Sequence, residues 1–205
     1  MLTDADSHIG RLMEALNEME LAENTIVIFS SDNGPADYPP AKIAGSTAGL
    51  KGRKTMIFQG GVNVPFIVRW PGHVDPGTTD STSVMCTVDL IPTFCELAGK
   101  ELPGAYECDG ESFASIFENE AFQRSKPIFW EWRFPTERPG KPNSWIYSAV
   151  RYGDWKLVAD EERERIELYN IAEDRFELND LAARESGKVA ELLAMWDEWK
   201  STLPE

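Results

Sequence analysis

The hydrophobic positions near the start of the chain recur every three or four residues. Between Asp6 and Leu21 they are Ile9, Leu12, Met13, Leu16 and Met19, the spacing of an amphipathic helix. An unbroken run of β-branched and aromatic residues follows at 25–29, and a second, largely apolar run lies at 65–70. Such runs are typical of strands that are buried on both faces of a helix-covered α/β sheet, so we expect two strands of that kind.

The pattern changes further along the chain. Residues 88–97 predict a helix, with Pro92 in its first turn and Gly99 after its end. Four short strands separated by turn residues are then expected, at 128–132, 145–151, 155–158 and 167–169. A last helix is expected at 185–199, with one apolar stripe formed by Val189, Leu192, Leu193, Trp196 and Trp199.

These elements predict an α/β fold class in two parts. Residues 1–122 are expected to form a sheet domain, and residues 123–205 a small α+β subdomain in which an antiparallel meander packs on the last helix. Turn residues at 140–143 and 153–154 separate strands of the meander.

Composition narrows the class of protein. Thirty-five acidic residues against twenty Lys and Arg give the 205 residues a net charge of −15, which argues against nucleic acid as a partner and against a polybasic membrane-surface protein. No apolar run approaches the roughly 20 residues of a membrane helix, and no signal peptide is apparent after Met1. Residues 160–185, with ten acids and four arginines, are expected to be a solvated edge.

Asp32 and Asn33 are the strongest local signal for chemistry. They follow the first predicted buried strand, where open α/β sheets place ligand-binding groups, and their oxygens suit Ca²⁺ or Mg²⁺. Asp-Asn-Gly-Pro is also an ordinary turn sequence, so both interpretations stay open on the residues alone. Two oxygens cannot complete a six- or seven-coordinate site, so further ligands would have to come from elsewhere.

A glycine-rich loop at 45–54 brings three cations close together in sequence. Its spacing does not match a phosphate-binding P-loop, and no strand directly precedes it. Lys51, Arg53 and Lys54 remain candidates for gripping an oxyanion, and a solvated loop is the alternative.

The remaining reactive side chains offer no nucleophile. His8 and His73 are expected at the surface. Cys86, Cys95 and Cys108 fit no zinc pattern and are expected to be buried or half-buried thiols, with one disulfide as the alternative. The cellular compartment is left open.

The order of motifs along the chain resembles the sulfatase family (arylsulfatase-like) of the alkaline phosphatase superfamily. The resemblance covers nearly the whole chain and is carried by residues 24–34, Lys54, Gly60-Gly61-Val62-Asn63-Val64-Pro65, Arg69-Trp70-Pro71-Gly72, residues 88–93, 108–112, 150–157, 167–170 and 177–181. It implies that residues 1–122 are the C-terminal part of an alkaline-phosphatase-like α/β sheet domain.

Family membership implies roles for three residues. Asp32 and Asn33 match ligands of the divalent metal of the family, usually Ca²⁺, and Lys54 matches the lysine that binds the sulfate group. The metal and the ammonium would together stabilise charge that develops during S–O cleavage. The implied substrate of the parent enzyme is a sulfated small molecule or glycan.

Other parts of the family pattern are missing. The family nucleophile is a formylglycine made from a Cys or Ser in a Cys/Ser-x-Pro-Ser-Arg motif, and none of the three cysteines stands in that context. The chain therefore resembles the C-terminal portion of a sulfatase, and we expect it to be inactive alone. Gln59 and Asn63 replace a Glu and an Arg that are common in the family, which suggests that an ion pair has been lost.

Three interpretations follow from this resemblance. The chain is part of a sulfatase, or a non-catalytic module that binds Ca²⁺ or a partner, or part of a phosphate or phosphonate ester hydrolase of the same superfamily. In each case the strands are expected to expose sheet edges and apolar faces. We therefore predict self-association, as a symmetric dimer that covers this surface.

Overall fold

The chain forms two compact units in a computed structural model that describes residues 2–36, 45–104, 106–132 and 148–204. The first unit holds residues 1–30 and 65–123, and the second holds residues 31–64 and 124–205. The segment 31–64 thus leaves the first unit and packs in the second. The division into domains 1–122 and 123–205 stays a prediction.

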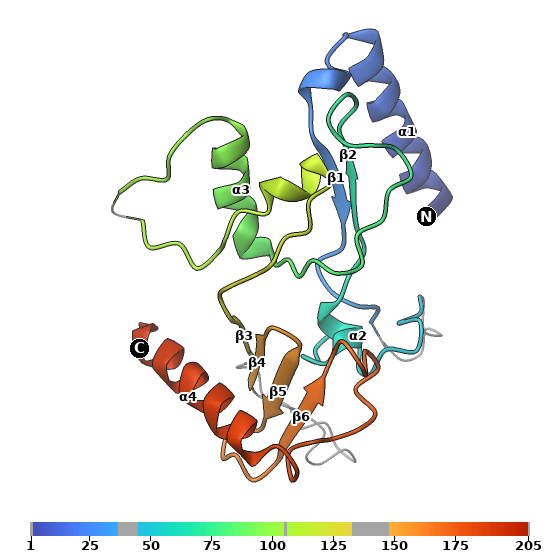
Figure 1. Ribbon diagram of the computed structural model, residues 1–205. Coiled ribbons are helices and arrows are strands. Elements are labelled where there is room, and N and C mark those ends of the chain that lie inside the picture. The colour runs from blue at the N-terminus through green and yellow to red at the C-terminus, as the bar shows by residue number, and fades with distance from the viewer. Residues whose placement is uncertain (1, 37–44, 105, 133–147, 205) are drawn as a thin grey trace. The chain divides into compact units, whose positions relative to one another are not determined.

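The first unit begins with a helix and two strands. Helix α1, Leu2–Glu18, starts four residues earlier and ends three residues earlier than the pattern predicts, and the 3-10 turn η1, Ala22–Asn24, follows it. Strands β1, Val27–Ser30, and β2, Phe66–Arg69, pair antiparallel. Both predicted strands are therefore present (Figure 1).

The prediction that these strands are buried on both faces is wrong for this chain. Phe29 and Ile67 lie opposite each other across the β1–β2 pair, and their exposed fractions are 51% and 59%. Only two strands pair in this sheet, and no residue of α1 is buried. The apolar runs thus predict the strands correctly, but the described residues supply no layer over the face that carries Phe29 and Ile67.

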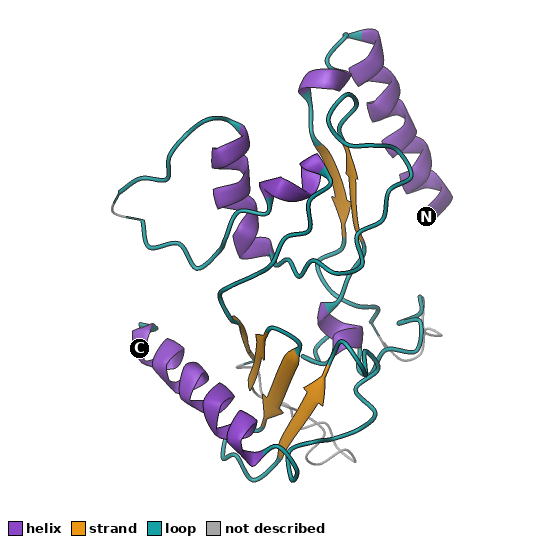
Figure 2. Ribbon diagram, viewed as in Figure 1, coloured by secondary structure: helices purple, strands orange, loops and turns teal. Residues whose placement is uncertain are grey.

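The rest of the first unit consists of short helical segments joined by long loops (Figure 2). The predicted helix at 88–97 is present as the 3-10 turn η2, Thr87–Asp89, continued by α3, Leu90–Leu97. A further 3-10 segment, η3, spans Ala114–Glu118.

A fully buried carboxylate connects these segments. Asp89 accepts hydrogen bonds from the backbone N–H of Cys86 (2.7 Å) and of Glu111 (2.9 Å). The Thr93 hydroxyl donates to the Asp89 carbonyl (2.7 Å) and accepts from the Phe113 N–H (3.0 Å). Asp89 and Thr93 therefore hold the loop after residue 108 against the start of α3, which is a structural role.

The second unit contains the predicted antiparallel meander and the helix that packs on it. The strands are β3, Ile128–Glu131; β4, Ser148–Tyr152; β5, Trp155–Ala159; and β6, Ile166–Asn170, and each pairs with the next. Helix α4, Ser186–Thr202, follows. The predicted turn at 140–143 and the first residues of the predicted strand 145–151 lie outside the described residues.

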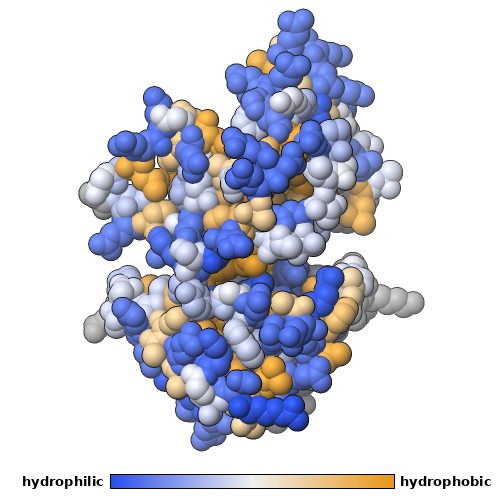
Figure 3. All heavy atoms as spheres, viewed as in Figure 1, coloured by the Kyte–Doolittle hydropathy of each residue, from blue (hydrophilic) through white to orange (hydrophobic). Residues whose placement is uncertain are grey.

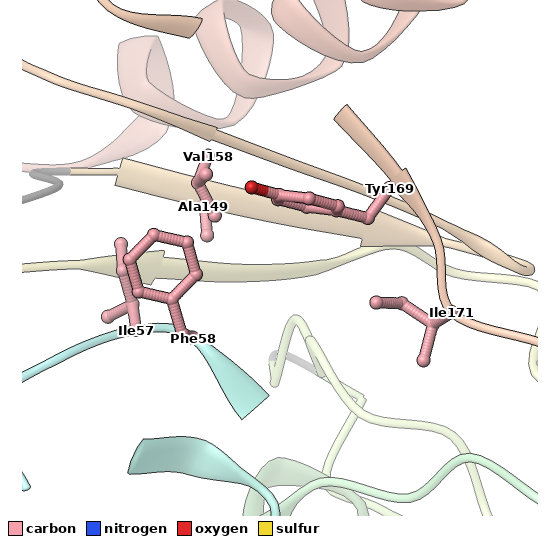
Figure 4. Packing of buried hydrophobic residues seen from close by; sticks show 6 residues of the cluster. All are labelled: Ile57, Phe58, Ala149, Val158, Tyr169 and Ile171. Atoms are coloured by element: carbon pink, nitrogen blue, oxygen red, sulfur yellow. The ribbon is translucent and has the colours of Figure 1, made fainter. Parts of the chain in front are cut away.

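The two faces of this sheet bury different partners. Alternate residues of β4, β5 and β6 point to opposite faces, as the two-residue period of a strand requires. One face packs on α4 through Val150, Leu157, Leu168, Leu192 and Trp196. The other face packs on the segment before α2, the short helix Gln59–Val62, through Ala149, Val158, Tyr169, Ile57 and Phe58 (Figure 4). The described residues contain no helix with the length and apolar character needed to cross a membrane.

Candidate functional site

Asp32 and Asn33 lie at a bend of the second unit, named here the Asp32–Asn33 turn, directly after β1 in sequence. The Asp32 side chain is exposed and that of Asn33 is half-buried. The Ser31 hydroxyl donates to the Asn33 carbonyl (3.0 Å), and the Asn33 amide nitrogen donates to the Gly34 carbonyl (3.0 Å). These hydrogen bonds hold the local backbone and leave the oxygens of both side chains as acceptors.

Lys54 lies on the loop that a backbone contact joins to this turn. Its N–H donates to the Pro35 carbonyl (3.1 Å). The side chain is half-buried, and within the described part of the chain its ammonium makes no hydrogen bond or ion pair. The next residue, Thr55, has φ of 73°, a left-handed conformation that a β-branched residue rarely adopts. Strained backbone of this kind gathers at functional sites.

Three glycines let the backbones of these segments approach closely. The Gly34 N–H donates to the Gly61 carbonyl (2.9 Å), and the Gly60 N–H donates to the Lys51 carbonyl (2.6 Å). A Cβ on Gly34 would lie 1.8 Å from the Gly60 oxygen, and one on Gly61 would lie 1.9 Å from the Met56 oxygen. Helix α2 therefore holds the Asp32–Asn33 turn and the Lys54 loop together, in a geometry that excludes a side chain at these glycines.

Lys51 is not available to an oxyanion in the way the sequence suggests. Its ammonium donates to Glu167 (2.9 Å) and to the Tyr169 hydroxyl (2.7 Å), and lies 4.2 Å from the centre of the Phe58 ring. Burial opposes ionisation of Glu167, but hydrogen bonds from Tyr169, Lys51 and Arg165 lower its pKa below the usual value. Burial and the bond to Glu167 raise the pKa of Tyr169. The Glu167 carboxylate thus neutralises the Lys51 ammonium, and this ion pair anchors the loop of Lys51 on β6.

A second ion pair lies deeper in the same unit. The Lys156 ammonium and a Glu177 oxygen are 2.8 Å apart, and both side chains are fully buried. The other Glu177 oxygen accepts a hydrogen bond from the backbone N–H of Gln59 (2.7 Å) at the start of α2. Burial lowers the pKa of Lys156 to about 8, and the attraction of Glu177 partly offsets that effect. The pair therefore joins β5 to the helix that holds the candidate site.

Sequence reasoning missed both acidic residues of these pairs. The solvated edge expected at 160–185 is wrong for Glu167 and Glu177, which are buried. A charge run does not reveal which carboxylates face a lysine far away in sequence, because the meander has to form before Lys51 and Lys156 reach them. The sequence did hold one indication: both acids stand in segments that carry the family resemblance, residues 167–170 and 177–181.

Gln59 and Asn63, the two departures from the family pattern, lie in different environments. Gln59 is only 4% exposed, whereas Asn63 is exposed. Since the Gln59 N–H already binds Glu177, a carboxylate at position 59 would add a second negative charge to a buried region, and a neutral amide avoids that repulsion. Loss of an ion pair between positions 59 and 63 stays a prediction.

The remaining candidate residues lie where the sequence predicts. His8 and His73 are both exposed, and the His73 ring stacks on Trp70 with 3.8 Å between ring centres. Cys86, Cys95 and Cys108 are free, half-buried thiols, so no disulfide joins them.

The donor set can be tested against the divalent metal that the resemblance implies. Asp32 and Asn33 offer two hard oxygens of the kind Ca²⁺ binds, and the fixed Asn33 amide nitrogen leaves the oxygen of that side chain free to coordinate. In the described residues no group of three or more His, Cys, Asp or Glu side chains is placed to hold a metal ion. The residues therefore fit Ca²⁺ in kind and would supply two of its six to eight ligands.

Two family profiles match the chain. The profile described as Sulfatase matches residues 1–100, and the profile described as N-sulphoglucosamine sulphohydrolase, C-terminal, matches residues 52–198. A sulfatase of Formosa agariphila is 35% identical over 193 residues, which make up 87% of this chain and 34% of that protein. Arylsulfatase A of Homo sapiens is 32% identical over 155 residues, or 76% of this chain and 29% of the human protein. The chain thus spans about a third of the length of these curated relatives.

Solved structures agree with this comparison. The structure of Ps i-CgsB in complex with k-i-k-neocarrahexaose matches with a TM-score of 0.75 at 25% identity, and the match covers 97% of this chain and 41% of that one. A structure in complex with D-Glucosamine-2-N, 6-O-disulfate, named as its substrate, matches in fold with a TM-score of 0.69 at 24% identity, over 98% of this chain and 39% of that one. These likenesses confirm the predicted fold class.

Proposed function

Because this chain belongs to the sulfatase family and matches its C-terminal portion, we propose that it is part of a sulfuric ester hydrolase. In this proposal Asp32 and Asn33 ligate Ca²⁺, and Lys54 binds the sulfate group. The observation that carries the proposal is the backbone connection of the Asp32–Asn33 turn to the loop of Lys54, whose ammonium stays unneutralised among the described residues.

The proposed chemistry is stabilisation of negative charge. Bound Ca²⁺ would supply a second positive charge and polarise sulfate oxygens. The Lys54 ammonium binds a sulfate oxygen and gains interaction energy as negative charge grows on the leaving oxygen and the sulfuryl group. Its half-buried position strengthens this attraction relative to bulk water. None of Cys86, Cys95 and Cys108 lies in the formylglycine motif, so we propose that this chain alone does not supply the nucleophile.

The proposed substrate class is a sulfated small molecule or glycan. It is supported by the two solved relatives, one in complex with a neocarrahexaose and the other with a glucosamine disulfate. The superfamily alternative, a phosphate or phosphonate ester, would use the same cation pair. The relative affinity of the chain for sulfate and for phosphate can therefore be compared by titrations that follow the Lys54 loop.

Replacing Lys54 with alanine is expected to lower the affinity of the chain for sulfate at least about tenfold, which is the effect of losing one charge-assisted contact. NMR titration with sodium sulfate, with sodium chloride at matched ionic strength as reference, would follow the amide signals of residues 52–56. Lys100→Ala removes an exposed lysine of the first unit and should leave the affinity unchanged. A parallel titration with phosphate ranks the two anions.

Unchanged sulfate affinity in Lys54→Ala, or an equal loss in Lys100→Ala, would remove the assignment of Lys54. Addition of CaCl₂ should raise the sulfate affinity of the wild-type chain but not that of Asp32→Ala. If Asp32→Ala responds to Ca²⁺ like the wild type, the metal assignment fails.

A non-catalytic role as an association module is the second candidate, and the exposed Phe29–Ile67 pair favours it. Hydrophobic surface is visible among the hydrophilic side chains of the first unit in Figure 3. We propose that the 205-residue chain forms a symmetric dimer that covers the exposed apolar face of the β1–β2 pair, on which Phe29 and Ile67 lie.

Phe29→Lys combined with Ile67→Lys is expected to convert the dimer to a monomer, since two like charges would face each other across the interface. Light scattering after size-exclusion chromatography at micromolar concentration gives the mass. Leu178→Lys, which changes a 75% exposed apolar residue of the second unit, should leave the dimer intact. A monomeric wild-type chain contradicts the proposal.

A further inference from the structure

We propose that Glu177 is a positioning residue for the candidate site: through α2 it holds the Asp32–Asn33 turn against the Lys54 loop. The purpose of this positioning rests on the proposed function, whereas its geometry rests on contacts that the structure shows. Glu177 touches neither Lys54 nor Asp32 in any hydrogen bond. It acts on them through backbone groups.

The first step of the argument is the binding of Glu177 to α2. One Glu177 oxygen accepts from the Gln59 N–H at 2.7 Å, and the other accepts from the Lys156 ammonium at 2.8 Å. Both carboxylate oxygens are thereby used. Since Glu177 and Lys156 are fully buried, water cannot replace either bond, and the carboxylate fixes the start of α2 relative to β5.

The second step runs from α2 to the site. Gly60 and Gly61 are the second and third residues of α2. Gly60 donates to the Lys51 carbonyl at 2.6 Å, and Gly61 accepts from Gly34 at 2.9 Å. A displacement of α2 would therefore move both the loop that carries Lys54 and the turn that carries Asp32. The glycines leave no side chain that could absorb such a movement.

The backbone conformation of Glu177 indicates that its side chain is needed at this position. Its φ is 56°, in the left-handed region that favours glycine or asparagine. Glutamate in that conformation is strained, which costs conformational free energy. The two buried hydrogen bonds of the carboxylate compensate for that cost.

Two double variants separate the contact with α2 from charge and packing. Lys156→Met with Glu177→Gln removes both charges but keeps an oxygen that can accept from the Gln59 N–H. Lys156→Met with Glu177→Leu also removes both charges and fills similar volume, but it offers no acceptor. Amide hydrogen exchange, followed by NMR on the 205-residue chain, reports the hydrogen bonds of the site directly.

In the leucine variant the protection of the Gly34 and Lys54 amides is expected to fall at least about tenfold relative to the wild type, a loss of about 1.4 kcal/mol. The amides of the β4–β5 ladder should stay within about twofold. In the glutamine variant all of these amides should resemble the wild type.

Wild-type protection of Gly34 and Lys54 in the leucine variant would overturn the proposal. So would a uniform loss along the β4–β5 ladder, or failure of that variant to fold, because both assign the pair a general structural role. The sulfate titration of Lys54→Ala remains independent: a site that stays positioned but binds no sulfate contradicts the proposed function and leaves the positioning role intact.

Discussion

Gly61→Ala is expected to lower the free energy of unfolding of the second unit by at least about 3 kcal/mol, at the upper end of the effects of single substitutions. The new Cβ would lie 1.9 Å from the Met56 carbonyl oxygen and 2.6 Å from that of Arg53. Both contacts involve backbone atoms, which cannot rotate away as a flexible side chain can. The segment must shift as a whole, and the bond from Gly34 to Gly61 breaks.

Urea unfolding followed by tryptophan fluorescence measures this effect in the second unit, because six of the seven tryptophans lie in residues 124–205. Gly187→Ala is the matched control. Gly187 lies in α4 and a Cβ there meets nothing within 4 Å, so alanine should stabilise the helix by up to about 1 kcal/mol. A Gly61→Ala variant as stable as the wild type would mean that α2 is not held as tightly as the backbone contacts require.

The meander could be predicted from the sequence because its signals are local. Within the strands between 128 and 170, successive residues point to opposite faces of the sheet, and turn residues mark where strands end. The apolar stripe of α4 likewise lies within a single helix. The first unit shows the limit of the same reasoning. Residues 25–29 predict a strand correctly, but burial of Phe29 depends on a neighbouring layer, and a single strand does not reveal whether that layer is present.

The candidate site could be predicted only in part, for a related reason. Asp32, Asn33 and Lys54 stand in recognisable motifs, and the structure joins their segments. The groups that join them are backbone atoms of Gly34 and Gly61, and glycine in a sequence does not reveal which backbone it approaches. Glu177 was missed because its partners, Lys156 and Gln59, are 21 and 118 residues away in sequence.

Lys156→Met is expected to lower the free energy of unfolding by about 3 to 5 kcal/mol, because it leaves the Glu177 carboxylate buried without its counter-charge. Methionine fills nearly the same volume, so lost packing contributes little. Adding Glu177→Leu removes the unpaired charge and should recover most of the loss. The double-mutant cycle therefore gives a large coupling energy between the two residues, and nearly additive effects in urea unfolding would contradict the observed pair.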